Sequence, residues 1–409
     1  GFQAFELYDT YGFPLELTQE IAEENELLVD IKGFESEMKK QRQRAKDAAV
    51  SIDLTVQGAI EKVVSNLEPT VFNGYDHLES SAVVLAILIN GEPVEIASTG
   101  DKVQILIDQT PFFGESGGQI GDKGVLLGNE LIIAIDGVIK EKGVYIHSGT
   151  IERGTLQLQQ NVNAKVDNLS RLRARANHTA THLLQSALKL ILDPSVGQKG
   201  SLVAFDRLRF DFNSPSSVTS KQLQEVETLI NDWISQDHPI VIELMPIDKA
   251  LEAGALAMFG EKYGDIVRVV DVPGVSKELC GGTHVTHTSE LGVFKIISES
   301  GVASGIRRIE AVSGPSVLTY LNDRDRVVKH LSEIFKAQPS EIIDRVVTLQ
   351  NEVKEVSRAL VNVKNELAIA KALALVNQTT SIGEYQFIVE RLDGIEGSAL
   401  QNASLSLVN

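Results

Sequence analysis

The spacing of apolar residues changes repeatedly along this chain, and no single repeating core can satisfy all of its segments. Short apolar runs separated by Gly, Asn and Asp occupy residues 63–166, whereas helical spacing precedes them and returns after them. The 409 residues also exceed what one ordinary core accommodates. The sequence therefore predicts a multidomain α+β protein.

The pattern divides the chain into five parts. We expect residues 1–62 to be helical and residues 63–166 to form a small β-barrel. Helices and strands mix in residues 167–315, which we predict to be an α+β core. Residues 316–378 are predicted to be helical, and residues 379–409 begin with a strand pattern that has little core of its own.

The helical segment that follows Pro339 carries apolar residues at spacings that alternate between four and three. This alternation is typical of the a/d seam of a coiled coil. The partner stays open, since a second chain or an antiparallel helix of the same chain could cover the seam. The seam residues are Ile342, Val346, Leu349, Val353, Val356, Leu360, Val363 and Leu367.

The net charge of −18 argues against a protein that coats nucleic acid without specificity. Local basic clusters remain candidates for RNA contacts, although each could equally be a solvated charged face. They include Arg171, Arg175, Arg307 and Arg308. No apolar run approaches the roughly 20 residues that span a bilayer, so we expect no membrane partner. Because the chain has one cysteine, a disulfide framework is excluded and a cytoplasmic location is expected.

Two short motifs hold the residue types that bind metals. His178 and His182 lie four residues apart in a predicted helix, so both imidazoles face the same side. Cys280 and His284 are separated by Gly-Gly-Thr, and glycines suit a tight turn that aims both side chains inward. Three imidazoles and one thiolate are the kind of ligand set that zinc prefers, so we predict one zinc ion per chain.

The chemistry of such an ion stays open at this stage. The metalloprotease pattern is absent, because Thr179 stands where its glutamate base would be. Four protein ligands usually form a closed structural site. A catalytic ion would need one loose ligand, or it would position the substrate without ionising water.

These motifs resemble the editing domain of alanyl-tRNA synthetases and the free-standing AlaX-type deacylases. The proofreading domain of threonyl-tRNA synthetases shares the two histidine and cysteine pairs. The resemblance covers nearly the whole chain. It is carried by FELYDTYGFPLELT (5–18), TPFFGESGGQIGDKG (110–124), NHTATHLL (177–184), VGQKGSLV (196–203), ELCGGTHV (278–285) and GIRRIEA (305–311).

The resemblance implies a function and a set of roles. His178, His182, Cys280 and His284 would be zinc ligands, and Thr181 and Gln198 would line the editing pocket. The editing domain would hydrolyse Ser-tRNA(Ala) and Gly-tRNA(Ala), because an alanine pocket cannot strongly reject such close analogues. The base that activates water is not assigned.

The resemblance also implies partners and an arrangement of parts. Residues 1–62 would end a tRNA-recognition region, and residues 379–409 would begin a C-terminal domain that supports dimerisation in the family. The acceptor end of tRNA(Ala) would be the partner, and a homodimer is expected through the coiled coil and the C-terminal region. ATP and Mg²⁺ would serve only an aminoacylation domain, which we do not expect in this chain.

Overall fold

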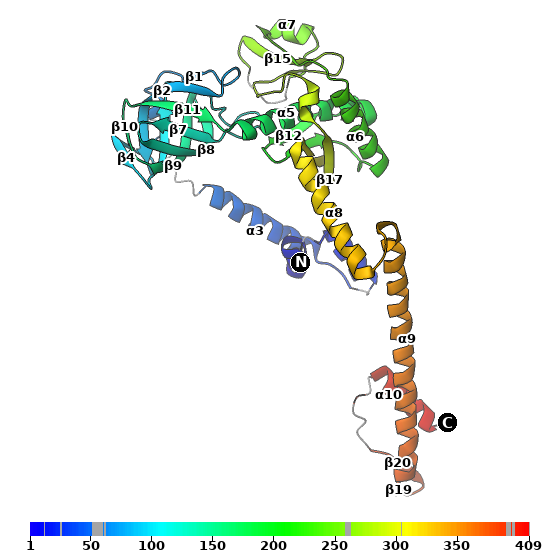
Figure 1. Cartoon of the computed structure of the whole chain (residues 1–409). Coiled ribbons are helices and arrows are strands. Elements are labelled where there is room, and N and C mark those ends of the chain that lie inside the picture. The colour runs from blue at the N-terminus through cyan, green and yellow to red at the C-terminus, as the bar shows by residue number, and fades with distance from the viewer. Residues whose placement is uncertain are drawn as a thin grey trace. The chain divides into compact units, whose positions relative to one another are not determined.

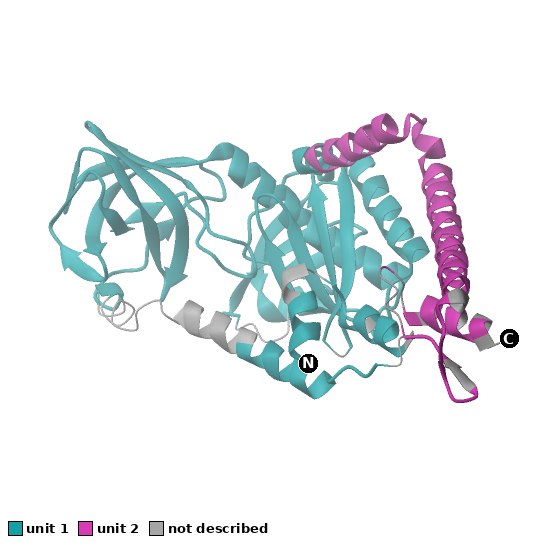
Figure 2. Ribbon diagram, turned by 90° about the horizontal axis from the view of Figure 1, so that it is seen from below, with its two compact units in different colours: residues 1–318 teal, residues 319–409 magenta. Residues whose placement is uncertain are grey.

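The computed structural model describes residues 1–11, 13–24, 27–50, 60, 63–257, 263–303, 305–389, 394 and 397–408. They form two compact units, residues 1–318 and residues 319–409, which Figure 2 shows in teal and magenta. Among the described residues, no helix combines the length and the apolar character that crossing a membrane requires.

Three helices begin the first unit, namely α1 (Phe2–Tyr11), α2 (Leu15–Glu24) and α3 (Ile31–Val50). The rings of Phe5 and Phe34 meet edge to face with their centroids 6.3 Å apart, which packs α1 against α3. Most of the stretch from residue 51 to residue 62, where the helical prediction continues, lies outside the described residues.

Six antiparallel strands then close into a barrel, as predicted for residues 63–166 (Figure 1). They follow the order β11-β7-β8-β9-β5-β2, and β11 pairs with β2 to complete the ring. The strands are β2 (Glu79–Ile89), β5 (Lys102–Ile107), β7 (Gly124–Gly128), β8 (Leu131–Glu141), β9 (Val144–Arg153) and β11 (Asn161–Val166). The short strands beside them are β1 (Val71–Phe72), β3 (Glu92–Val94), β4 (Ile96–Ser98), β6 (Gln109–Thr110) and β10 (Thr155–Gln157).

One histidine belongs to the interior of this barrel. His147 is fully buried, and its two ring nitrogens lie 2.8 Å from Thr110 Oγ1 and 3.1 Å from the carbonyl of Ile105. Burial lowers the pKa of His147 to about 4, so the ring is neutral at pH 7.

The mixed α+β part is built on the long helix α5 (Asn168–Ile191). Asp167 caps it by accepting a hydrogen bond from the Ser170 amide. Helix α6 (Ser220–Ser235) packs beside α5, and Thr219 caps it in a reciprocal capping box with Gln222. Both helices cover a four-stranded antiparallel sheet of order β12-β13-β18-β17. Its strands are β12 (Gln198–Val203), β13 (Leu208–Asn213), β17 (Phe294–Ala303) and β18 (Ile306–Ser313).

A smaller sheet of order β14-β15-β16 completes this part and leads into the turn that carries Cys280. Its strands are β14 (Val241–Pro246), β15 (Ile266–Val272) and β16 (Ser276–Leu279), with the short helix α7 (Ile247–Glu252) and the 3-10 helix η1 (Thr288–Leu291). The turn at residues 280–284 directly follows β16, so this sheet sets the position of the turn.

A buried ion pair joins the barrel to α5. Arg171 and Asp122 are both fully buried, and Arg171 donates to both carboxylate oxygens of Asp122. Arg171 also donates to the carbonyls of Gly74 and Pro111 at 2.5 and 2.7 Å. Because these partners belong to the barrel segment, the first turn of α5 is fixed to the barrel by charge-assisted hydrogen bonds.

The second unit consists of a long helix with small additions. Helix α8 (Pro315–Phe335) leads into it, followed by η2 (Pro339–Glu341), α9 (Ile342–Ala374), η3 (Leu375–Gln378), β19 (Thr380–Ile382), β20 (Tyr385–Phe387) and α10 (Gly397–Val408). Within the described residues, α10 packs on the end of α9 through small side chains such as Ala372 and Ala403. Most of the predicted seam is exposed, including Val356 at 67% and Leu360 at 54%. The coiled coil therefore stays a prediction.

Candidate metal centre

Two elements bring the four candidate ligands together. His178 and His182 face the same side of α5, and Cys280 and His284 belong to the turn after β16. One ligand atom from each residue lies within 4.8 Å of the others, and three of the four side chains are buried. Cys280 Sγ lies 3.4 Å from His178 Nε2 and 3.3 Å from His284 Nε2. The group could hold a metal ion.

An unsatisfied nitrogen supports this assignment. His182 Nε2 is buried and has no hydrogen-bond partner among the residues that the structure describes, although such atoms are normally paired. The Glu278 carboxylate lies 3.7 Å away, beyond hydrogen-bonding distance. A metal ion between the imidazoles and the thiol would satisfy His182 Nε2 with the lone pair it offers.

The orientation of His178 is set by Gln119, which lies in the glycine-rich barrel loop. The Thr283 amide donates to Gln119 Oε1 at 3.0 Å, and Gln119 Nε2 donates to Thr283 Oγ1 at 2.9 Å. These two bonds fix the amide, so Oε1 accepts from His178 Nδ1 at 2.7 Å. The lone pair of His178 is therefore on Nε2, the atom nearest Cys280 Sγ, as a metal ligand requires.

His284 has a similar support. Thr179 Oγ1 lies 3.1 Å from His284 Nδ1, and it also accepts from the Val285 amide at 3.4 Å. Thr179, which stands where a metalloprotease would have its glutamate, thus orients the imidazole of His284 so that its Nε2 faces Cys280. Such contacts to the outer nitrogen are typical of metal-binding histidines.

The charges around the centre favour a thiolate. Burial raises the pKa of the Cys280 thiol, but the imidazoles of His178 and His284 outweigh burial and hold this pKa well below its ordinary value. Burial acts to lower the pKa of His182, yet Glu278 and Cys280 raise it to about 9. A metal ion that binds here therefore displaces a proton from His182.

The two glycines of the turn have different roles. A side chain at Gly282 would place its Cβ 2.0 Å from His178 Cε1, whereas a Cβ at Gly281 would meet no atom of the described residues within 4 Å. Neither residue has a left-handed backbone. Gly282 is required because the turn approaches the imidazole closely, and Gly281 is not required for that reason.

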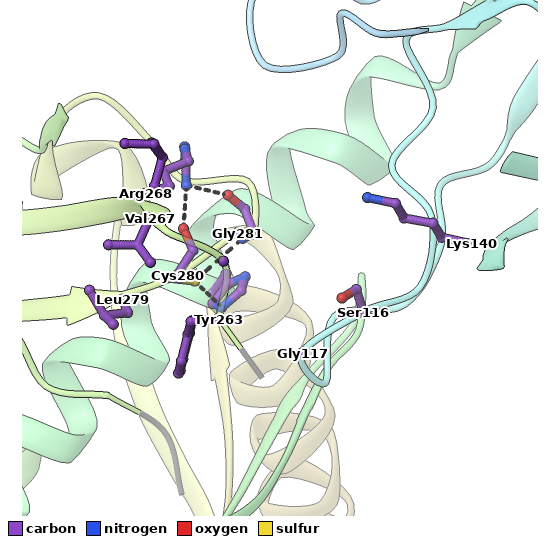
Figure 3. Close-up of a pocket in the computed structure, with 13 residues that line it drawn as sticks. Ser116, Gly117, Lys140, Tyr263, Val267, Arg268, Leu279, Cys280 and Gly281 are labelled. Atoms are coloured by element: carbon purple, nitrogen blue, oxygen red, sulfur yellow. Dashed lines mark hydrogen bonds between the residues drawn. The ribbon is translucent and has the colours of Figure 1, made fainter. Parts of the chain in front are cut away.

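A cavity of about 420 Å³ opens beside the centre, between the barrel and the α+β part. His178, Arg268 and Cys280 contribute to one wall, and Ser116 and Lys140 contribute from the barrel. Figure 3 shows Lys140 and Ser116 on the barrel ribbon, across the cavity from Cys280 and Arg268. None of the described residues that line it is acidic. Two ligands of the metal centre thus face a basic cavity.

The two residues expected in the editing pocket lie elsewhere. Gln198 lines a second cavity of about 330 Å³, together with Gln185 and Glu278. Thr181 is buried and donates to the carbonyl of Asn177 at 2.8 Å within α5. Among the residues described, Thr181 lines neither cavity. Only Gln198 is therefore open to a ligand in this structure.

The four arginine candidates for tRNA contacts are largely engaged within the protein. Arg171 is fully buried with its guanidinium bound to Asp122, so the expectation of a tRNA contact at Arg171 is corrected: its role is structural. Arg175 is half-buried and donates to the carbonyl of Tyr75 at 2.8 Å. Arg307 and Arg308 each form two hydrogen bonds with one carboxylate, contributed by Glu299 and Asp211 respectively.

Sequence reasoning missed Gln119, Thr179 and Glu278 as neighbours of the centre. Gln119 is 59 residues from His178 in the chain, so no local spacing connects them. A signal existed, since Gln119 lies in a glycine-rich loop that is not a phosphate-binding loop. Glu278 lies two residues before Cys280, so its carboxylate could have been predicted to lie beside a metal ligand.

Two family models match this chain. The model described as tRNA synthetases class II (A) matches residues 1–170, which include the helices and the barrel. The model described as threonyl and alanyl tRNA synthetase second additional domain matches residues 267–310, which include Cys280 and His284.

The chain is also similar over its whole length to curated proteins named alanine–tRNA ligase. It is 61% identical over 414 residues to that of Prochlorococcus marinus strain MIT 9303 and 60% identical over 407 residues to that of Synechococcus sp. strain CC9902. Each match covers 100% of this chain and 46% of the relative. The chain thus spans about half the length of the curated relatives it matches.

Proposed function

We propose that this chain, which belongs to the alanyl-tRNA synthetase family, hydrolyses the ester of mischarged tRNA(Ala) at the metal centre on α5. The substrates would be Ser-tRNA(Ala) and Gly-tRNA(Ala). The observation that carries the proposal is that Cys280 and His178 belong to the ligand group and also line an open basic cavity.

The cavity suits the end of a nucleic acid. Lys140 and Arg268 face it from opposite walls, and the described lining has no carboxylate, although the chain as a whole has a net charge of −18. This local segregation of charge favours phosphate over a neutral small molecule. The acceptor end of tRNA(Ala) is therefore the partner we propose.

The ion would be zinc, because three imidazoles and one thiolate form the donor set that zinc prefers. When bound, zinc supplies a positive charge that polarises or orients the reacting ester. Gln119 and Thr179 keep two imidazoles in the required orientation. All three imidazoles are buried, so bulk water has little access to their rings.

Discrimination would depend on polar groups in the second cavity. Gln198 lines it together with the buried Glu278, whose carboxylate lies 3.7 Å from His182 Nε2. A serine hydroxyl could pair with such groups, whereas alanine would leave them unpaired at a cost of about 1–3 kcal/mol. We propose Gln198 as one of these groups, with Thr181 supporting the local shape of α5.

The remaining expectations concern the family's whole enzyme. We propose that ligation of alanine with ATP and Mg²⁺ belongs to the part of the relatives that this chain does not match, since 46% of each relative is covered. We place the reaction in the cytoplasm, where a thiolate ligand stays reduced.

We also propose that the exposed apolar seam of α9 pairs with a second copy as a coiled coil.

The test is release of serine from seryl-tRNA(Ala) by the zinc-loaded chain, with alanyl-tRNA(Ala) as the rejected substrate. We expect His182→Ala to abolish release, because it removes one ligand. The control is His287→Ala, which removes an imidazole that is half-exposed and paired with Asp237. If the zinc-loaded protein releases neither serine nor glycine, the catalytic proposal is wrong.

A second candidate function is a tRNA-binding module with a closed structural zinc, which the presence of four protein ligands favours. In that case His182→Ala would unfold the α+β part. Circular dichroism separates the two functions, because the catalytic proposal expects a folded but inactive variant.

A further inference from the structure

The backbone of the metal turn is held from outside by two side chains. Arg268 Nη1 donates to the carbonyl of Cys280 at 2.9 Å and to the carbonyl of Gly282 at 2.8 Å. Tyr75 Oη donates to the carbonyl between them, that of Gly281, at 2.6 Å. Three consecutive carbonyls are thus fixed, and Figure 3 shows the bonds made by Arg268.

These two side chains also contact each other. The Arg268 guanidinium lies over the Tyr75 ring, with its carbon 4.2 Å from the ring centroid. This is a cation–π contact between partly desolvated groups, which keeps both donors aimed at the turn. Arg268 comes from β15 in the α+β part, whereas Tyr75 comes from the barrel segment between β1 and β2. We call this pair the Tyr75–Arg268 clamp.

The clamp is anchored to the helix that carries the other two ligands. Arg175 of α5 donates to the carbonyl of Tyr75 at 2.8 Å, and Arg171 of α5 donates to that of Gly74 at 2.5 Å. The ring of Phe72 meets Tyr75 edge to face at 4.9 Å. Helix α5 therefore positions its own histidines directly and positions the turn through the barrel segment.

We propose that Tyr75 and Arg268 are positioning residues, which orient the turn so that Cys280 Sγ faces the imidazoles and the site retains its ion. The inference rests on the proposed metal centre. The distances between a metal ion and its ligands deviate by only about 0.2 Å from their standard values. Gly281 and Gly282 have no side chains to restrain their peptides, so the partners of their carbonyls supply that restraint.

The test compares two matched tyrosine variants of the full chain. Tyr75→Phe removes the hydroxyl that binds Gly281 and keeps the ring under Arg268. Tyr145→Phe removes the same group from a barrel ring that stacks on Phe72 at 5.5 Å. We expect zinc to dissociate into a chromophoric chelator about 10-fold faster from Tyr75→Phe, as loss of an outer-shell partner does elsewhere. We expect no change for Tyr145→Phe.

A second readout does not need the metal. Cys280 is the only cysteine, so the rate at which metal-free protein reacts with a disulfide reagent reports on this thiol alone. We expect Tyr75→Phe to react several-fold faster than wild type, with an unchanged thermal midpoint. If the wild-type protein binds no zinc, the proposed function is wrong, but the thiol reactivity still tests whether the Tyr75–Arg268 clamp positions the turn. Thiol reactivity within twofold of wild type, or equal effects in both variants, would overturn the inference.

Discussion

The exchange of Gly282 for alanine is the sharpest perturbation of the centre that the structure offers. The new Cβ would lie 2.0 Å from His178 Cε1 and 2.3 Å from His178 Nδ1. The ring must retreat by at least about 1.4 Å to reach an ordinary contact of 3.4 Å. Zinc–ligand distances stay within about 0.2 Å of their standard values, so His178 would leave the coordination sphere.

The retreat would also break the bond between His178 Nδ1 and Gln119 Oε1, which is 2.7 Å long. Loss of an outer-shell partner alone costs 10–100-fold in metal affinity, so we expect Gly282→Ala to weaken zinc binding by at least about 100-fold. The assay is competition with a chelator of known affinity. Gly281→Ala is the control, because within the described part of the chain its Cβ would meet no atom closer than 4 Å. Equal zinc affinities of the two variants would show that the close approach of Gly282 to His178 does not affect the metal centre.

Three further predictions address the barrel and the long helix. Asp122→Asn leaves the buried charge of Arg171 uncompensated, so urea unfolding should show a loss of about 3–5 kcal/mol, and a loss below about 1 kcal/mol would contradict this. The pKa of His147 is about 4 in the folded protein, against an ordinary value of 6.5, so the folded barrel binds fewer protons than the unfolded chain. The free energy of unfolding should therefore decrease by about 1.4 kcal/mol per pH unit as the pH falls from 6.5 to 4. His147→Gln should flatten this slope in unfolding experiments at several pH values, and an unchanged slope would assign it to other groups. Val356→Lys should shift the chain from dimer to monomer in sedimentation, whereas a wild-type monomer would contradict the proposed coiled coil.

The parts of the fold that the sequence predicted are those with local periodicity. Short apolar runs separated by Gly, Asn and Asp predicted the barrel, and the strands that they form, such as β8, bury alternate residues in its interior. The seam of α9 has an equally clear period, but its partner is not determined by the sequence of one helix.

In the candidate site, too, the sequence predicted only the residues that belong to a local pattern. The two ligand pairs were found because each lies within five residues of chain. Gln119 and Tyr75 were missed because they reach the centre from the barrel, 164 and 206 residues before the groups they bind in the turn. The misassignment of Arg171 has a related cause, because an arginine on a helix surface and one paired with a distant Asp122 have the same local pattern.

The most direct test of the account is titration of the metal-free chain with zinc while serine release from seryl-tRNA(Ala) is measured. If the four ligands hold a zinc ion that hydrolysis requires, the rate rises in proportion to bound zinc and stops rising at one equivalent per chain. A folded protein that releases serine at the full rate before any zinc is added would contradict it.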